Sequence, residues 1–294
     1  MKISLKNIHV NPIMKKDLRI RSRSMKFAWG LFAFEAVLGL VFFFAINLMS
    51  LDRYGYTETY KALVYMFPVI GAVELGILSL IIPIETASAI TSEREKQTFD
   101  ILLTTVMTPM QVIRGKVNSA TFHMMIYIIA SIPLMAVAFT VGGLSWWALL
   151  GFLITSFIFA YYVGSIGILC STLTKKSIGS IVLSYVFMGI FFGGSWTPMA
   201  IILMFAQSSG VEELGALTLL FNPAVSFVMF FMTAMGAGDE DIFGGMLIKS
   251  PLVWMIVSFS LMIGLSLLFQ WFASTRIDPV RGYKERSQTK AGVQ

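Results

Sequence analysis

Two carboxylic acids, Glu35 and Glu74, each interrupt a long apolar run of this sequence. A charged side chain inside a bilayer is costly, so it usually pairs with another group and often belongs to an ion or substrate site. These residues could therefore bind a cation or a proton. They could instead hydrogen-bond a nearby Ser, Tyr or backbone carbonyl and only hold helices together. We favour this packing role, because neither residue belongs to the charged motif described below.

Other reactive residue types are few and isolated. Cys170 is the only cysteine, so the chain forms no internal disulfide, and neither His9 nor His123 has a second ligand type nearby. Nucleophilic triads, paired cysteines and metal-ligand spacings are missing, as is the G-x-x-x-x-G-K-[ST] motif that binds nucleotide phosphates. The sequence therefore predicts no catalytic residue, metal or cofactor in this chain, and we do not expect it to be an enzyme by itself.

The composition is that of a membrane protein. Apolar residues make up 56% of the 294 residues, and charged residues only 13%. A soluble domain usually carries about 25% charged residues, so we expect an all-α integral membrane protein. The net charge of +6 does not indicate nucleic acid as a partner, because Lys and Arg commonly flank membrane spans.

Apolar runs predict six transmembrane helices in one membrane domain that covers residues 1–294. They are residues 27–49, 62–84, 117–141, 146–169, 178–205 and 252–272. Most Lys and Arg lie before the first span, in the second-to-third and fourth-to-fifth connections, and in the tail 273–294. The opposite side has only Arg53, Lys61 and Lys249. This bias predicts a multi-pass protein with both termini in the cytoplasm. We expect it in the plasma membrane of a bacterial cell.

The segment 196–250 can be interpreted in two ways. Residues 214–235 are long enough to form a seventh span, but Asn222-Pro223 interrupts them. We prefer two short helices, near 197–205 and 224–235, that enter the outer leaflet and return as a re-entrant pair.

The N-terminal segment 11–25 has the pattern of an interfacial helix. Asn11-Pro12 is a favourable helix start, and Met14, Leu18 and Met25 recur on one face while basic residues occupy the other. We expect an elbow helix lying on the anionic lipids of the inner leaflet. The alternative is ordinary basic flanking sequence.

A charged stretch, residues 85–116, separates the second span from the third. Within it, Thr98 can cap a short helix over 98–108, with Asp100 in its first turn, and Pro109 ends it. Phe99, Leu102 and Leu103 then lie on one face of that helix. An apolar face of this size in the cytoplasm needs a partner to cover it.

The same stretch resembles the signature of the type-2 (type V) ABC exporter permeases, which reads E-R-E-x-G-T, then an acidic-leucine stretch, T-P and G-K. The matching residues are Glu93-Arg94-Glu95, Thr98, Leu102-Leu103, Thr108-Pro109 and Gly115-Lys116. Gln97 departs from the pattern, because it stands where the family usually has glycine. The resemblance implies a coupling helix that binds an ATP-binding subunit through Glu93, Arg94, Glu95, Thr98, Phe99, Asp100, Leu102 and Leu103.

The resemblance also implies the partners and the activity. Two ATP-binding subunits would hold ATP and Mg, and two permease chains, identical or different, would enclose the pathway. The cargo would be hydrophobic or amphipathic, such as a lipid, a drug or a peptide. Two other functions stay open: an ion-coupled secondary transporter that uses Glu35 and Glu74, and a membrane sensor or immunity component that moves no cargo.

Overall fold

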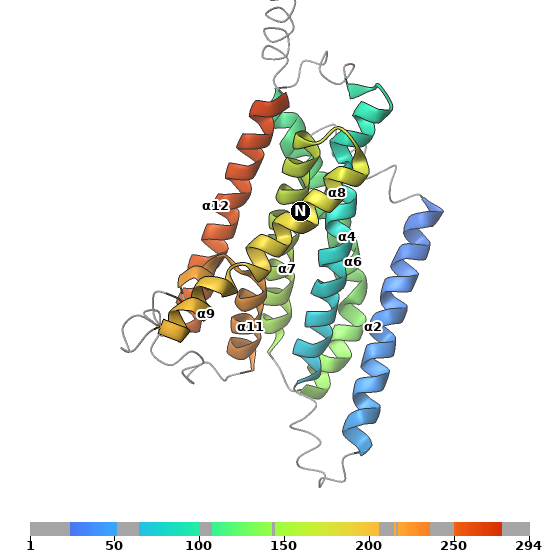
Figure 1. Cartoon of the computed structure of the whole chain (residues 1–294). Helices are drawn as coiled ribbons and strands as arrows, with labels where there is room; N and C mark the ends of the chain where they lie inside the picture. Colours follow the sequence, from blue (N-terminus) through green and yellow to red (C-terminus); the bar gives the residue numbers. More distant parts are fainter. Residues whose placement is uncertain are drawn as a thin grey trace, which may run out of the picture.

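The computed structural model describes residues 24–51, 65–99, 108–142, 145–205, 215, 217–235 and 250–277. These residues form helices, and no strand occurs among them, so the prediction of an all-α protein is confirmed. The helices are α2 (Met25–Leu51), α4 (Met66–Glu95), α6 (Pro109–Gly142), α7 (Trp146–Leu173), α8 (Ser177–Met188), α9 (Trp196–Phe205), α11 (Pro223–Ala234) and α12 (Pro251–Ile277) (Figure 1).

Six of the described segments are long and apolar enough to cross a membrane, as predicted. They are Met25–Asn47, Met66–Glu95, Pro109–Val137, Trp146–Leu173, Ser177–Ile202 and Pro251–Ile277. The 30 residues of α4 give a helix of about 45 Å, which exceeds the ~30 Å hydrocarbon core of a bilayer. α4 therefore continues well past Ile84, where the predicted second span ends, and carries Glu93, Arg94 and Glu95 in its last turn.

α7 occupies the centre of the bundle, and α2 lies at its edge. α7 packs against α4, α6, α8 and α12 and is the most buried of the candidate spans. α2 is the least buried and packs mainly on α4 and α6, where Figure 1 shows it as the outermost helix. Phe27 and Phe34 of α2 hold it in place, because both rings meet the ring of Tyr127 on α6 at 5.4 Å.

The predicted helix 178–205 is divided in the structure. α8 ends at Met188 and passes into a π-helix, Gly189–Gly193, before α9 begins at Trp196. A π-helix shifts the backbone hydrogen bonds by one residue and leaves carbonyls in need of donors. Asn222 supplies one, because its side-chain amide donates to the Phe192 carbonyl at 2.7 Å. Asn222 lies 30 residues further along the chain, so the local sequence pattern does not predict where the helix 178–205 is divided.

The short helices α9 and α11 lie close to the predicted positions 197–205 and 224–235. Asn222 caps α11 by accepting a hydrogen bond from the Ala224 amide at 2.9 Å, and Pro223 is the first helical residue. A 3₁₀ turn, Leu219–Phe221, precedes this cap, so the described part of 214–235 is not one continuous helix. Most of the elbow helix 11–25 and the tail beyond Ile277 lie outside the described residues.

Candidate functional site

The end of α4 has the backbone geometry of a Schellman turn. The Thr98 amide donates to the Glu93 carbonyl at 2.9 Å, and the Gln97 amide donates to the Arg94 carbonyl at 3.1 Å. Gln97 has a φ of 57°, and it is the one residue other than glycine with a positive φ in the described part of the chain. Glycine is the usual residue at this position of the turn. The departure from the expected motif therefore falls at a position whose backbone conformation favours glycine.

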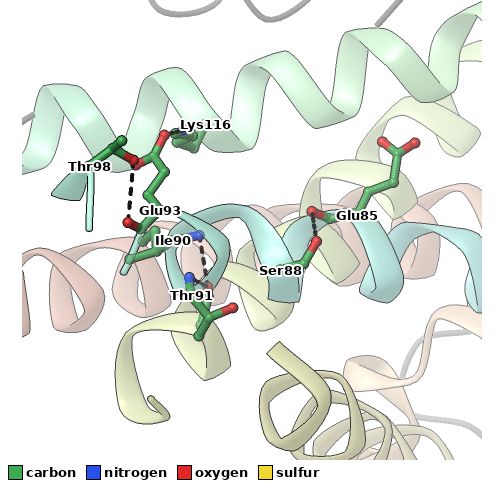
Figure 2. A network of polar contacts seen from close by, with 8 residues as sticks. Glu85, Ser88, Ile90, Thr91, Glu93, Thr98 and Lys116 are labelled. Atoms are coloured by element: carbon green, nitrogen blue, oxygen red, sulfur yellow. Dashed lines mark hydrogen bonds and ion pairs between the residues drawn. The ribbon is translucent and has the colours of Figure 1, made fainter. Parts of the chain in front are cut away.

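Glu93 connects α4 to α6. Its carboxylate forms an ion pair with Lys116, with 2.6 Å between Oε1 and Nζ. The Lys116 side chain is 9% exposed and the Glu93 side chain 24% exposed. Figure 2 shows the side chains of Glu93 and Glu85 leaving α4 in the same direction, towards α6. A partly buried pair of this kind is costly to break, because the remaining charge would lose its partner.

Arg94 connects α4 to the end of α7. Its Nη1 donates to the carbonyls of Thr172 at 3.4 Å and Thr174 at 3.0 Å. The last carbonyls of a helix have no partner within the helix and carry its negative dipole end, so a guanidinium is well suited to them. The same guanidinium lies 5.0 Å from the centre of the Phe99 ring.

Glu95 connects α4 to the start of α8. Its two carboxylate oxygens accept hydrogen bonds from the Ser177 amide at 2.8 Å and the Ser177 hydroxyl at 3.0 Å. Glu95 lies beyond the predicted span, and these hydrogen bonds hold the pKa of its carboxyl below the ordinary value. A carboxylate at this place also suits the positive end of the α8 dipole.

These three consecutive residues and their partners form a polar hub, which we define as Glu93, Arg94, Glu95, Lys116, Thr172, Thr174 and Ser177. The hub joins α4 to α6, α7 and α8 at one end of the bundle. One turn away, the amides of Ile90 and Thr91, both labelled in Figure 2, donate to the Ser171 hydroxyl at 3.0 and 3.1 Å. We did not predict Thr172, Thr174, Ser171 or Ser177 as site residues, because they lie about 80 residues from their partners in α4.

The predicted coupling helix lies only partly within the described residues. Thr98 is exposed, and its hydroxyl donates to the Glu93 carbonyl at 3.3 Å. Phe99 is half-buried and packs against a cluster of this chain that includes Ile90 and Ile113. Asp100, Leu102 and Leu103 lie outside the described residues, so the helix over 98–108 stays a prediction.

Thr108-Pro109 begins α6. The Thr108 amide donates to the Gln111 side-chain oxygen at 3.0 Å, and the Gln111 amide donates to the Thr108 hydroxyl at 3.3 Å. These reciprocal bonds form a capping box, and proline is favourable at the first helical position. We predicted only that Pro109 ends the preceding segment, and the structure adds its role as a helix start.

A second set of polar groups lies along the contact between α4 and α6, on the side of the bundle covered by α2. The Ser131 hydroxyl donates to Glu74 at 2.8 Å, and His123 Nδ1 lies 3.0 Å from Glu85 Oε2. The sequence showed no partner for His123, because Glu85 is 38 residues away. Phe27 of α2 covers the His123 ring, with 4.6 Å between ring centres. Throughout the described ranges, no group of three His, Cys, Asp or Glu side chains could hold a metal ion.

The fold and the hub together define a helical multi-pass membrane protein whose helices are tied at one end by charged and polar side chains. No family model matches the sequence, and no curated protein matches it in a sequence comparison.

We expect Gln97→Gly to raise the melting temperature of the purified protein by about 2 °C. Glycine adopts a positive φ without the steric cost, about 1 kcal/mol, that a Cβ atom imposes there. Tryptophan fluorescence during heating in detergent would measure the change. Gln97→Ala is the control, because it shortens the side chain and keeps the Cβ. An equal rise in both variants would show that relief of the backbone is not the cause.

Proposed function

We propose that this chain is the membrane-spanning permease subunit of an ATP-driven exporter of the type-2 (type V) ABC class. One observation carries the proposal. The E-R-E residues, which resemble the family motif, each connect α4 to a different helix, immediately before the segment expected to bind the ATPase. If a partner pushes on the segment, such connections transmit the movement to several helices. A loop that only links two spans does not need them.

The hub suggests how movement of the 98–108 segment would reach the membrane. The segment leaves α4 through the Schellman turn at Gln97 and enters α6 through the capping box at Thr108, so both of its ends are attached to rigid helices. Glu93, Arg94 and Glu95 then connect α4 to α6, α7 and α8. A push on the segment would move four helices together. Closure of the ATPase pair could in this way open a pathway between two permease chains.

The remaining parts of the proposal follow the resemblance and the charge bias. Two ATP-binding subunits would hold ATP and Mg and would bind at the cytoplasmic side, which is the side of the hub. Both termini would face the cytoplasm of a bacterial cell, and the elbow helix would lie on its inner lipid surface. α9 and α11 would form the re-entrant pair at the outer surface. The cargo would be a hydrophobic or amphipathic molecule, such as a lipid, a drug or a peptide.

Co-purification tests this proposal. We expect the tagged chain, purified in detergent from the cells that naturally produce it, to retain an ATP-binding cassette protein. The complex should hydrolyse ATP in lipid vesicles, and a variant of the partner that cannot hydrolyse ATP should remove the activity. An ion-coupled transporter would need no such partner. Stable transport by the chain alone, driven by an ion gradient, would contradict the proposal.

A further inference from the structure

Glu74 is the most deeply buried acidic side chain in the described part of the protein. It belongs to α4, its relative exposure is 0%, and it faces Ser131 of α6. Ser131 donates to Oε2 at 2.8 Å. The other oxygen, Oε1, is buried, and no hydrogen bond from the described residues reaches it.

Glu35 adds a second carboxyl from a different helix. It belongs to α2 and lies at the depth of Ser131, because Gly30 and Gly39, on either side of it in α2, lie against Tyr127 and Leu134, on either side of Ser131 in α6. Its Oε1 is likewise buried and receives no hydrogen bond from the described residues. The flanking residues Phe34 and Leu38 are buried in the main core, so α2 is seated against the bundle at this depth.

The hydrogen bond from Ser131 to Glu74 fits the packing role that we favoured from the sequence, but this role does not account for the second oxygen of Glu74 or for Glu35. Ser131 satisfies one oxygen of Glu74, and a glutamine side-chain oxygen could accept the same hydrogen bond. An ionised carboxylate with an unpartnered buried oxygen costs more than a neutral amide in an apolar interior. A second carboxyl nearby adds like-charge repulsion when both are ionised, and this repulsion is strong at low dielectric. Two orphaned carboxyl oxygens, contributed by two helices, are suited to a positively charged partner.

The chemistry around the carboxyls favours an ammonium group over an inorganic cation. A hard metal ion takes about six or more oxygen ligands, whereas the described residues contain no group of three His, Cys, Asp or Glu side chains that could hold one. An ammonium group carries three donors, which Glu35, Glu74 and one further acceptor would satisfy.

The position of α2 supplies a route from the bilayer. α2 is the least buried candidate span, and Glu35 is only half-buried on it. Large apolar side chains of α2, including Phe32, Val37 and Leu40, are exposed around Glu35. An amphipathic molecule could therefore keep its apolar chain against this surface while its charged end reaches the carboxyls.

We propose that Glu35 and Glu74 bind the ammonium group of an amphipathic amine that reaches them from the bilayer along α2. As a cargo assignment, this inference rests on the proposed export function. Binding itself does not, because it requires only α2, α4 and α6 of this chain.

A melting experiment on the chain without any ATPase tests the proposal. The purified full chain in lipid nanodiscs would be heated with dodecylammonium or with dodecanol, a matched neutral probe, and followed by the fluorescence of its six tryptophans. We expect the amine to raise the melting temperature more than the alcohol does. Titration should show at least a ~10-fold higher Kd for the amine in Glu74→Gln and in Glu35→Gln, since each removes one of the two charges.

Two controls separate binding from packing. Glu85→Gln removes a carboxyl of α4 that is paired with His123, 11 positions from Glu74, and should keep the affinity for the amine. Ser131→Ala removes the partner of Glu74 and keeps both carboxyls, so it should lower the melting temperature without amine and retain most of the amine-induced shift. If Glu74→Gln does not fold, the half-buried Glu35→Gln decides the question.

Three results would overturn the proposal. They are equal shifts for amine and alcohol in the unmodified chain, wild-type affinity in either folded Glu→Gln variant, and an equal loss of affinity in Glu85→Gln. Failure to co-purify an ATPase would leave the amine binding unchanged. The export function and the amine site can therefore fail separately.

Discussion

Leu102→Asp is expected to abolish retention of the ATP-binding subunit during purification. A cytoplasmic helix that exposes several large apolar side chains needs a partner to cover them, and each contributes about 1.5–3 kcal/mol when fully buried. Interface energy is concentrated in a few such anchors. Aspartate removes this contribution and adds an unpaired charge to the covered surface, so the affinity should fall by ~100-fold or more.

Leu102 is a sharper choice than Phe99 for this test. Phe99 is half-buried against its own chain and lies beneath Arg94, so its substitution would also disturb the end of α4. Lys96→Ala is the matched control, because Lys96 is exposed beside the turn and the substitution removes no apolar surface. Pull-down of the proposed ATPase partner from detergent extract, with the abundance of this chain as a folding control, gives the result. Wild-type retention of the ATPase by Leu102→Asp would remove the main support for the coupling-helix assignment.

The second large effect is expected for Gly167→Ala, which should lower the melting temperature by at least about 5 °C. Gly167 of α7 lies directly against Thr86 and Ala87 of α4. A Cβ atom there would overlap Thr86 Oγ1 and would lie 2.8 Å from Thr86 Cβ and 3.2 Å from the Ala87 amide nitrogen. Thr86 cannot easily turn away, because its hydroxyl is bound to the Ile82 carbonyl at 2.8 Å in a fully buried position. α4 and α7 would have to separate at the contact between Gly167 and Thr86.

Two companion variants make this prediction specific. Gly76→Ala changes a helical glycine of α4 with no atom near the added methyl group, so it should be neutral or slightly stabilising. Thr86→Ala combined with Gly167→Ala removes the overlapping hydroxyl and should recover part of the loss. The readout is thermal unfolding in detergent. An unchanged melting temperature in Gly167→Ala would mean that α4 and α7 lie further apart than described here.

The end of α4 illustrates how far sequence pattern alone could lead. Apolar runs stop at the first charged residues, so the second span was predicted to end at Ile84, whereas α4 continues to Glu95. At this end of α4, Glu93, Arg94 and Glu95 have partners on α6, at the end of α7 and on α8. Two of those partners lie about 80 residues away, and no local property of the charged stretch indicates them. The sequence shows the E-R-E motif. It does not show the contacts that each of its three residues makes with another helix.

The sequence by itself determined that this chain is helical, that it has six membrane-compatible segments, and that Asn222-Pro223 separates short helices. These features follow from local rules, because backbone groups in an apolar medium must be satisfied within each helix and because proline and side-chain caps act on their neighbours. Only the tertiary structure decided that a π-helix divides 178–205, that Ser131 and His123 are the partners of Glu74 and Glu85, and that Gly167 lies against Thr86. A helix that is apolar on every side has no single face that its sequence marks for packing. The partners of its few polar residues on other helices are therefore known only from the packed structure.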